Sequence, residues 1–595
     1  MWKWVIGRIR PVVDYRPRRQ DFRGLATCGI SLLAAFPVAM LWMAYGPFTV
    51  YPPKGFIDPW FYTGYFSHFH YLLTRSGITY YVSRLPWILP GRLAFGIAGG
   101  QWGSLLLSAG LLTLGAVSLY WIVRWHYGGA PAALAAVAWC TNPCVMATVG
   151  WQYPDGPVLA YGMAGLALYL RPTGNRRWNS FWAAALLVLA GATNLSGSPL
   201  ILAIVTVPLW RCRRSWTEFL KEAACSAMGA GAAALALSQI SQAVLGSPRF
   251  LQPQIDQTMY ALHTPGYLAS MWGTGPGFLT GAVRLFPPEF LLLFGPVLLI
   301  AVRKPAAAAW PLYLALCICC ALYAVQEFVL HGAALRVYYH SSYMMVLVLA
   351  FAGAALGEVW PRSPGGGRTA LVFAAAMGVG LVAASLVFNT VPPSPPGGRT
   401  WVWLALVGAC GLALAIVAHW PRLPVQFLTC ALILAILFLS SAVDPFTFGY
   451  VWTGQRFPHA SNLTSNANAD DFRHLMNLEK FLASNLDASR LPEFWWDTGE
   501  PDFDFFKSAA ALFLCGHEEI AQGLRSGDMA LMRYFFPGNR TFVHLTIYPE
   551  RIAGRNREMT SHGIVLGNER RAAFEYRGRP VAVVIEDVID SSRLH

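Results

Sequence analysis

The most regular feature of the chain is a succession of long apolar runs between residues 24 and 442, separated by short polar stretches. Most runs approach the roughly 17–25 residues with which an apolar helix crosses a bilayer. Because a soluble protein would not repeat this pattern so often, it predicts a polytopic helical membrane protein with about 13 spans. The predicted spans are residues 24–46, 103–123, 130–149, 156–170, 179–194, 198–210, 223–246, 288–302, 307–327, 341–357, 369–389, 401–419 and 425–442.

The pattern changes after residue 442. Residues 469–486 place apolar side chains along one face of a helix, as expected for a helix that covers a core. Three later stretches have the apolar and aromatic composition of strands. These predicted strands are residues 493–497, 542–548 and 580–585. Residues 443–595 are therefore predicted to form a small α/β domain on the aqueous, extracytoplasmic side.

Composition agrees with the membrane class. The 595 residues are 55% hydrophobic and 12% charged, and their mean hydropathy is +0.43. The net charge of +14 is unevenly divided: residues 1–442 carry 28 Lys or Arg against 10 Asp or Glu, whereas residues 443–595 carry 16 against 20. The positive excess belongs to the membrane part, where it sets orientation, so a nucleic-acid partner is not expected.

The same basic residues predict the topology. Residues 1–23 are rich in Lys and Arg and should be cytoplasmic, and every second junction between spans is also basic. Thirteen spans then place the C-terminal domain outside, together with two long outer loops at 47–102 and 247–287. Cys515 is the only cysteine of residues 443–595, so no disulfide framework is expected there, which fits a bacterial inner membrane facing the periplasm.

Candidate chemistry begins with two carboxylates. Asp58 lies in the first outer loop, surrounded by Trp and Tyr residues, and Asp155 lies in a tight hinge between two predicted spans. Acids are scarce in this part of the chain, and an acid near a membrane core favours a functional role. A pair at one membrane level would act as general base, position a nucleophile, or hold a divalent cation such as Mg²⁺ or Mn²⁺. The alternative is that each carboxylate simply stabilises a helix N-terminus.

Basic residues in outer loops form the second candidate set, because Lys and Arg are normally concentrated in cytoplasmic loops. Arg84 lies in the first outer loop and Arg336 directly before the tenth span, where Tyr339 and His340 follow it. Arginine matches phosphate oxygens with a planar fork, so these residues are candidate ligands for a phosphate-linked lipid. The alternatives are that the arginines extend to lipid headgroups and that His340 is only a hydrogen-bonding neighbour.

This layout resembles the GT-C glycosyltransferases, and within them the protein O-mannosyltransferase and aminoarabinose-transferase group. The resemblance in layout covers roughly residues 1–440, which makes 24–442 the predicted catalytic membrane domain. The motifs that carry it are Ile57-Asp58-Pro59-Trp60-Phe61-Tyr62, Ser83-Arg84-Leu85-Pro86, Asn142-Pro143 running into Asp155-Gly156-Pro157, and Arg336-Val337-Tyr338-Tyr339.

The resemblance implies a polyprenyl-phosphate sugar as donor and a glycan, lipid or protein as acceptor. It implies Asp58 as general base in an inverting displacement, with Arg336 and Arg84 stabilising the leaving phosphate. Two departures affect the metal and the acceptor. Protein O-mannosyltransferases carry an Asp-Glu pair where this chain has Asp58-Pro59, and oligosaccharyltransferases carry an acid-x-acid motif where Asp155 stands alone.

Two other classes share parts of this pattern. A transporter or lipid flippase would also be polytopic, but such proteins often have repeated halves and charged sites near the midplane. A polymerase or ligase of surface polysaccharide would also use a lipid-linked donor, yet it relies more on outer Arg and His than on an Asp in the first loop. Both classes stay open as alternatives.

Overall fold

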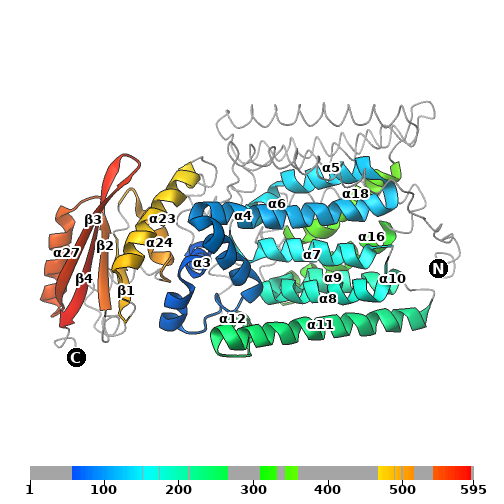
Figure 1. Ribbon diagram of the computed structural model, residues 1–595, viewed down its shortest axis with the longest axis horizontal. Coiled ribbons are helices and arrows are strands. Elements are labelled where there is room, and N and C mark those ends of the chain that lie inside the picture. The colour runs from blue at the N-terminus through cyan, green and yellow to red at the C-terminus, as the bar shows by residue number, and fades with distance from the viewer. Residues whose placement is uncertain are drawn as a thin grey trace. The chain divides into compact units, whose positions relative to one another are not determined.

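A computed structural model describes residues 57–150, 152–172, 174–211, 215–264, 309–330, 342–359, 467–487, 489–496, 500–514 and 540–590 (Figure 1). The chain divides into two compact units. One unit contains residues 109–149 and 154–461, and the other contains 49–108, 150–153 and 462–595. The predicted spans at 24–46, 288–302, 369–389, 401–419 and 425–442 lie outside the described residues.

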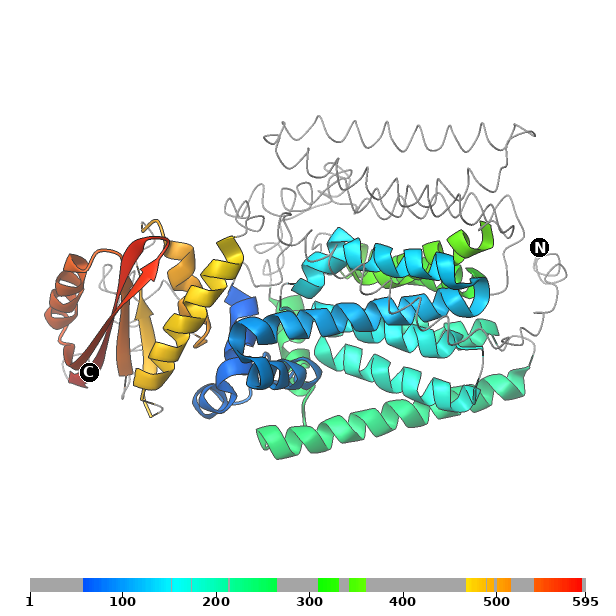
Figure 2. The same cartoon turned by 45° about the horizontal axis from the view of Figure 1, so that its top comes forward.

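The first unit is helical. Its helices lie side by side in both views (Figures 1 and 2), and α8 packs against both α7 and α11, while α18 packs against α5 and α16. Their bounds are α5 Gly129–Thr141, α6 Pro143–Gly150, α7 Asp155–Leu170, α8 Arg176–Thr193, η1 Leu195–Gly197, α9 Ser198–Val205, α10 Val207–Arg211, α11 Trp216–Leu245, α12 Gln252–His263, α16 Ala309–Phe328, η4 Ser342–Met344 and α18 Met345–Val359.

These helices follow the apolar runs. The run at 156–170 became α7, 179–194 became α8, and 307–327 became α16, each within a few residues. Among the described residues, α4 (Leu85–Tyr127) and α11 are long and apolar enough to cross a membrane. Helix α11 keeps large apolar side chains exposed, as expected for a surface that faces lipid rather than protein. These include Trp216, Leu220, Met228 and Leu235.

The second unit begins with a pair of helices that carry most of the candidate site. Helix α3 (Ile57–Ser76) contains a non-helical residue, His68, at which its direction changes. Helix α4 follows after a turn and is kinked at Gly99, whose φ of 74° only glycine adopts without strain. Residues of α4 up to 108 belong to the second unit, and those from 109 onward belong to the first.

The C-terminal part of this unit is a four-stranded sheet in the order β1-β2-β4-β3. Strand β1 (Leu491–Trp495) is parallel to β2 (Arg540–Thr546), and the other two pairs are antiparallel. Strands β3 (Val565–Tyr576) and β4 (Arg579–Asp590) form a hairpin. Helix α27 covers one face of the sheet, and α23 and α24 cover the other (Figures 1 and 2), which confirms an α/β fold. Their bounds are Glu550–Ser561 for α27, Ala467–Asn485 for α23 and Phe503–Ala511 for α24.

The sheet domain packs directly on α3 within the same unit. Gly64 makes this approach possible, because a Cβ atom there would lie 2.1 Å from the backbone oxygen of Leu512. The ring of Trp60 stacks on Phe472 at 5.6 Å between centroids, and the imidazole of His68 stacks on Phe513 at 5.3 Å. The helix that carries Asp58 is therefore part of the core of the C-terminal unit.

Buried charges in the sheet domain are paired. Glu500 accepts hydrogen bonds from Thr546 Oγ1 at 2.6 Å and from the Ile547 backbone N–H at 3.0 Å, and the Arg555 guanidinium lies 3.3 Å from the same carboxylate. A buried ion pair is costly to break by removal of one partner, because the other charge is left without compensation. This network fixes the position of α27 on the sheet.

Candidate active site

The site is built around the first turn of α3. Asp58 is the second residue of this helix, where the helix dipole favours a negative charge. Pro59 follows and is buried, with the fixed φ that suits the first turn of a helix. Tyr62 lies one turn further along and therefore projects from the same face as Asp58. Asp58 itself is half-buried.

Two tyrosine hydroxyls hold the carboxylate. Tyr81, from the turn before α4, donates to Asp58 Oδ1 at 3.0 Å. Tyr153, from the hinge before α7, donates to Asp58 Oδ2 at 3.0 Å. Each carboxylate oxygen accepts one of these hydrogen bonds, which orients the group and leaves further lone pairs on both oxygens.

A guanidinium lies next to this carboxylate, behind two more tyrosines. Arg84 is only 3% exposed, and its two terminal nitrogens donate to the hydroxyls of Tyr62 and Tyr80, each at 2.5 Å. The guanidinium also lies over the Tyr80 ring, 4.2 Å from its centroid. Because Arg84 uses these hydroxyls as acceptors, each hydroxyl keeps its own proton to donate elsewhere.

The two charges act on each other. Burial raises the pKa of Asp58 above its ordinary value, while the hydrogen bonds from Tyr81 and Tyr153 and the charge of Arg84 hold the increase down. Burial also raises the pKa of Tyr62 and of Tyr81 well above that of a free phenol. The tyrosines therefore stay neutral, and Asp58 is a carboxylate with increased basicity.

A strained backbone supports the Tyr153 contact. Gln152 has a φ of 54°, a left-handed conformation that costs a non-glycine residue about 1 kcal/mol or more. Its buried side chain accepts a hydrogen bond from Thr63 Oγ1 at 2.8 Å, which ties the hinge to α3. This conformation directs the next residue, Tyr153, toward Asp58.

Asp155 belongs to the first unit and has its own surroundings. It is buried at the first position of α7, where its Oδ1 accepts a hydrogen bond from Asn194 Nδ2 at 2.8 Å. The same amide nitrogen lies 3.0 Å from the hydroxyl of Tyr343. Asp155 is thus a buried carboxylate at a helix N-terminus, hydrogen-bonded to Asn194, whose amide also contacts Tyr343. A pairing of Asp155 with Asp58 stays a prediction.

Three further predicted site residues, Arg336, Tyr339 and His340, lie outside the described residues. Of the predicted set, the structure therefore describes Asp58, Arg84 and Asp155, and it brings Asp58 and Arg84 into one cluster.

The chain is similar to known proteins in structure but not detectably in sequence. No protein-family model matches the chain, and no curated protein matches it in sequence. Two crystal structures of ArnT from Cupriavidus metallidurans, one in the apo state and one bound to undecaprenyl phosphate, match with TM-scores of 0.45 and 0.46. Their sequences are 15% and 14% identical over 94% and 95% of this chain, and 98% of the ArnT chain is covered in each case.

An archaeal oligosaccharyltransferase also matches. It is AglB from Archaeoglobus fulgidus in complex with an inhibitory peptide and a dolichol-phosphate, with a TM-score of 0.42 and 13% identity over 89% of this chain and 70% of that one. The chain is similar to GT-C glycosyltransferase structures. Similarity at this level gives no residue-by-residue correspondence, and the roles of individual side chains rest on their own contacts.

The donor set around Asp58 does not fit a metal site. Its neighbours are two hydroxyl donors and a guanidinium, which compete with a cation for the carboxylate oxygens. Within the described ranges, no group of three or more His, Cys, Asp or Glu residues is placed to hold a metal ion. What the cluster can do is accept a proton at Asp58 and stabilise negative charge near the hydroxyls of Tyr62 and Tyr80.

The tyrosines are the site residues that sequence reasoning did not single out. The aromatic stretch around Asp58 could have pointed to Tyr62, and the position of Tyr80 and Tyr81 beside Arg84 could have pointed to that pair. Nothing local to Tyr153 marks it as a neighbour of Asp58, because that contact depends on the tertiary fold.

Proposed function

We propose that this chain is an integral membrane glycosyltransferase that transfers a sugar from a polyprenyl-phosphate donor to an acceptor on the outer face of the membrane. The observation that carries the proposal is the carboxylate–guanidinium cluster of Asp58 and Arg84, held by four tyrosine hydroxyls. Each hydroxyl makes a hydrogen bond of 2.5–3.0 Å to one of these two charged groups. A basic group and a cationic group in one shielded site are what a displacement at a sugar phosphate requires.

The proposed reaction is a single displacement with inversion. The acceptor hydroxyl oxygen attacks the anomeric carbon of the donor, and the bond from that carbon to the phosphate oxygen breaks. The bonding electrons leave with the phosphate, and the acceptor proton passes to Asp58. Phosphate is a good leaving group, so no strong general acid is needed.

Arg84 supports the leaving group in this scheme. Its guanidinium is buried behind Tyr62 and Tyr80, so its charge acts on the phosphate through the local field and through these hydroxyls. Tyr80 is half-buried and its hydroxyl accepts a hydrogen bond from Arg84, and we propose that this hydroxyl donates to a phosphate oxygen when the donor lipid is bound. A hydroxyl polarised by a cation is a stronger donor than a free one, because the two hydrogen bonds reinforce each other.

The remaining assignments belong to the proposal. Arg336, Tyr339 and His340 are proposed to contact the donor phosphate, and Asp155 is the proposed second carboxylate. A divalent cation, Mg²⁺ or Mn²⁺, is proposed to be bound near Asp155, and no step of the scheme depends on it. The proposed location is a bacterial inner membrane, with residues 1–23 in the cytoplasm and residues 443–595 in the periplasm.

The donor class is supported by the ArnT structure bound to undecaprenyl phosphate and the AglB structure bound to a dolichol-phosphate. Both molecules are polyprenyl phosphates. For this chain we propose the same class of lipid carrier, without assigning the sugar or the acceptor.

Transfer by the purified protein tests the proposal. The full chain in detergent is given a radiolabelled undecaprenyl-phosphate sugar and a membrane-lipid extract as acceptor, with no ion gradient. Release of undecaprenyl phosphate with the label in a new product supports a glycosyltransferase. Unchanged donor, combined with movement of the labelled lipid between leaflets in vesicles, would instead support a flippase. Label in products of increasing chain length would favour a polymerase.

A further inference from the structure

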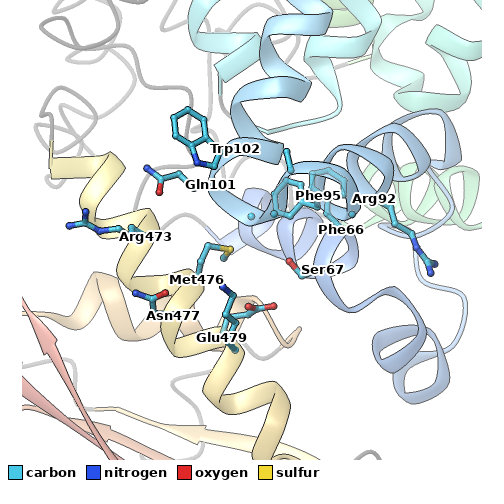
Figure 3. A pocket seen from close by; sticks show the side chains of 15 residues that line it. Phe66, Ser67, Arg92, Phe95, Gln101, Trp102, Arg473, Met476, Asn477 and Glu479 are labelled. Atoms are coloured by element: carbon cyan, nitrogen blue, oxygen red, sulfur yellow. The ribbon is translucent and has the colours of Figure 1, made fainter.

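A pocket lies within the C-terminal unit, formed by α3, the part of α4 around its kink, and α23 (Figure 3). Its volume is about 560 Å³, enough for a headgroup or a sugar-sized ligand. None of the residues of the Asp58 cluster lines it. Its lining residues include Phe66, Phe95, Trp102, Arg473, Asn477 and Lys480.

One wall is a single face of α23. Arg473, Asn477 and Lys480 are spaced by four and three residues, so they project from the same side of the helix. Arg473 and Lys480 are exposed, which keeps both cations accessible at the rim. Figure 3 shows Arg473 and Asn477 on the α23 side of the pocket, with Gln101 and Trp102 across from them on α4.

The opposite wall combines an apolar floor with polar groups. Phe66 and Phe95 are buried, and their rings lie 5.2 Å apart beneath the pocket. Trp102 is 65% exposed at the mouth, directly after the kink at Gly99 and next to the segment predicted to enter the membrane at residue 103. Tryptophan at such a position is typical of the membrane–water interface.

The pocket is positively charged. Glu479 is the only acid among its lining residues, and this buried carboxylate lies against the imidazole of His68. Arg473 forms an ion pair with Asp470, but the two side chains are 56% and 67% exposed, and such a pair contributes little. Among the described residues Lys480 has no ion-pair or hydrogen-bond partner for its ammonium group. Two cations on one helix face are therefore available to an anion.

We propose that this pocket binds the phosphate group of an anionic amphiphile, with Arg473 and Lys480 contacting the phosphate and the Phe66–Phe95 floor contacting the apolar part. Arg forks and Lys ammonium groups are the usual phosphate ligands in proteins, and Asn477 adds an amide donor between them. The site is separate from the Asp58 cluster. Its occupation is a binding event that does not depend on sugar transfer.

Binding of defined probes tests this site. The full chain in a neutral detergent is titrated with phosphatidylglycerol, with phosphatidylcholine and with soluble glycerol 3-phosphate, and bound molecules are counted by native mass spectrometry. The test variant is Arg473→Gln/Lys480→Gln. The control variant is Arg557→Gln/Arg571→Gln, which removes the same charge from exposed positions on α27 and β3 of the same unit. Circular dichroism and thermal unfolding verify that both variants are folded.

The expected result is that the wild type and the control bind phosphatidylglycerol alike, and that the test variant binds about tenfold more weakly or worse. Binding of glycerol 3-phosphate with the same variant dependence identifies the phosphate itself as the ligand. Binding of phosphatidylglycerol alone identifies a lipid headgroup. Equal binding by the two variants, equal binding of the two lipids, or no binding of either anionic probe would overturn the proposal.

Discussion

Tyr153 and Asp58 are 95 residues apart in the chain, yet the Tyr153 hydroxyl donates to Asp58 Oδ2 at 3.0 Å. This contact joins the hinge before α7 to the first turn of α3. It also accounts for the strained backbone at Gln152, whose φ of 54° brings Tyr153 to the carboxylate. The site is therefore built from two segments that are distant in sequence and meet only in the folded protein.

The hydrogen bonds to Asp58 predict a shift in pH dependence. Tyr81 stabilises the charged carboxylate, so Tyr81→Phe should raise the pKa of Asp58 further. The reaction needs the deprotonated base, and the acid limb of kcat/KM should therefore move to higher pH, by about one unit. Tyr65→Phe is the control, because the Tyr65 hydroxyl bonds to Thr79 and not to Asp58. An acid limb that is the same in wild type and Tyr81→Phe would count against Asp58 as the base.

The substitution Arg84→Lys tests whether the site needs the shape of the guanidinium as well as its positive charge. Lysine keeps the positive charge but cannot hold the hydroxyls of Tyr62 and Tyr80 with a fixed fork. We expect the kcat of Arg84→Lys to be about 100-fold below that of the wild type, as for loss of a donor that stabilises charge in the transition state. The kcat of Arg84→Gln should be lower still. Single-turnover measurements with a labelled donor give this value. Near wild-type turnover in Arg84→Lys would show that the fork is not needed.

Gly64→Ala tests the packing of the sheet domain on α3. The added Cβ would lie 2.1 Å from the backbone oxygen of Leu512, so the two elements must separate. We expect the free energy of unfolding of Gly64→Ala to decrease by about 1–3 kcal/mol, with a lower thermal midpoint. Transfer activity should fall too, since α3 carries Asp58. Gly554→Ala in α27, where a Cβ meets nothing within 4 Å, should be neutral or slightly stabilising. Equal midpoints for the two variants would contradict this packing.

His544 predicts how the sheet domain responds to acid. Burial lowers the pKa of this imidazole, although Glu586 lies 3.2 Å away and opposes the effect. At this residue the unfolded chain binds more protons than the folded chain below about pH 6.5, so the contribution of His544 to stability should fall as the pH decreases from 6.5 toward the folded pKa. Glu493 on β1, whose pKa burial raises to about 7, contributes in the opposite direction. Hydrogen exchange of the β2 amides measures this stability locally. In His544→Gln, the stability measured at the β2 amides should change less steeply between pH 6.5 and 5 than it does in the wild type. An unchanged slope of stability against pH would assign the acid sensitivity to another group.

Much of the fold could be predicted from local pattern. The run at 156–170 became α7 because its apolar length and the flanking Pro154 and Arg171 determine both ends. Strands β1, β2 and β4 agree with the predicted stretches because their apolar side chains fill the core. Strand β3 was not predicted. It is an edge strand with mostly exposed polar residues, among them Glu569, Arg570 and Arg571, so its pairing with β4 leaves no apolar alternation to detect.

The site was only partly predictable, for the same reason. The scarcity of acids was enough to select Asp58, and the topology bias was enough to select Arg84. Their mutual arrangement depends on four tyrosines and on the hinge at Gln152, which are brought together only by folding. Asp155 was selected by the same scarcity, but its contact with Asn194 spans 39 residues and has no signal in the sequence.

Asp58 is proposed as the base of the sugar transfer, and the substitution Asp58→Asn removes that base alone. Asparagine keeps the size of the side chain but cannot accept the acceptor proton at neutral pH. The variant is compared with wild type in the labelled undecaprenyl-phosphate sugar assay, after gel filtration and thermal unfolding verify that it is folded. We expect transfer to fall at least about 1,000-fold while the protein stays folded. Wild-type transfer by a folded Asp58→Asn protein would contradict it.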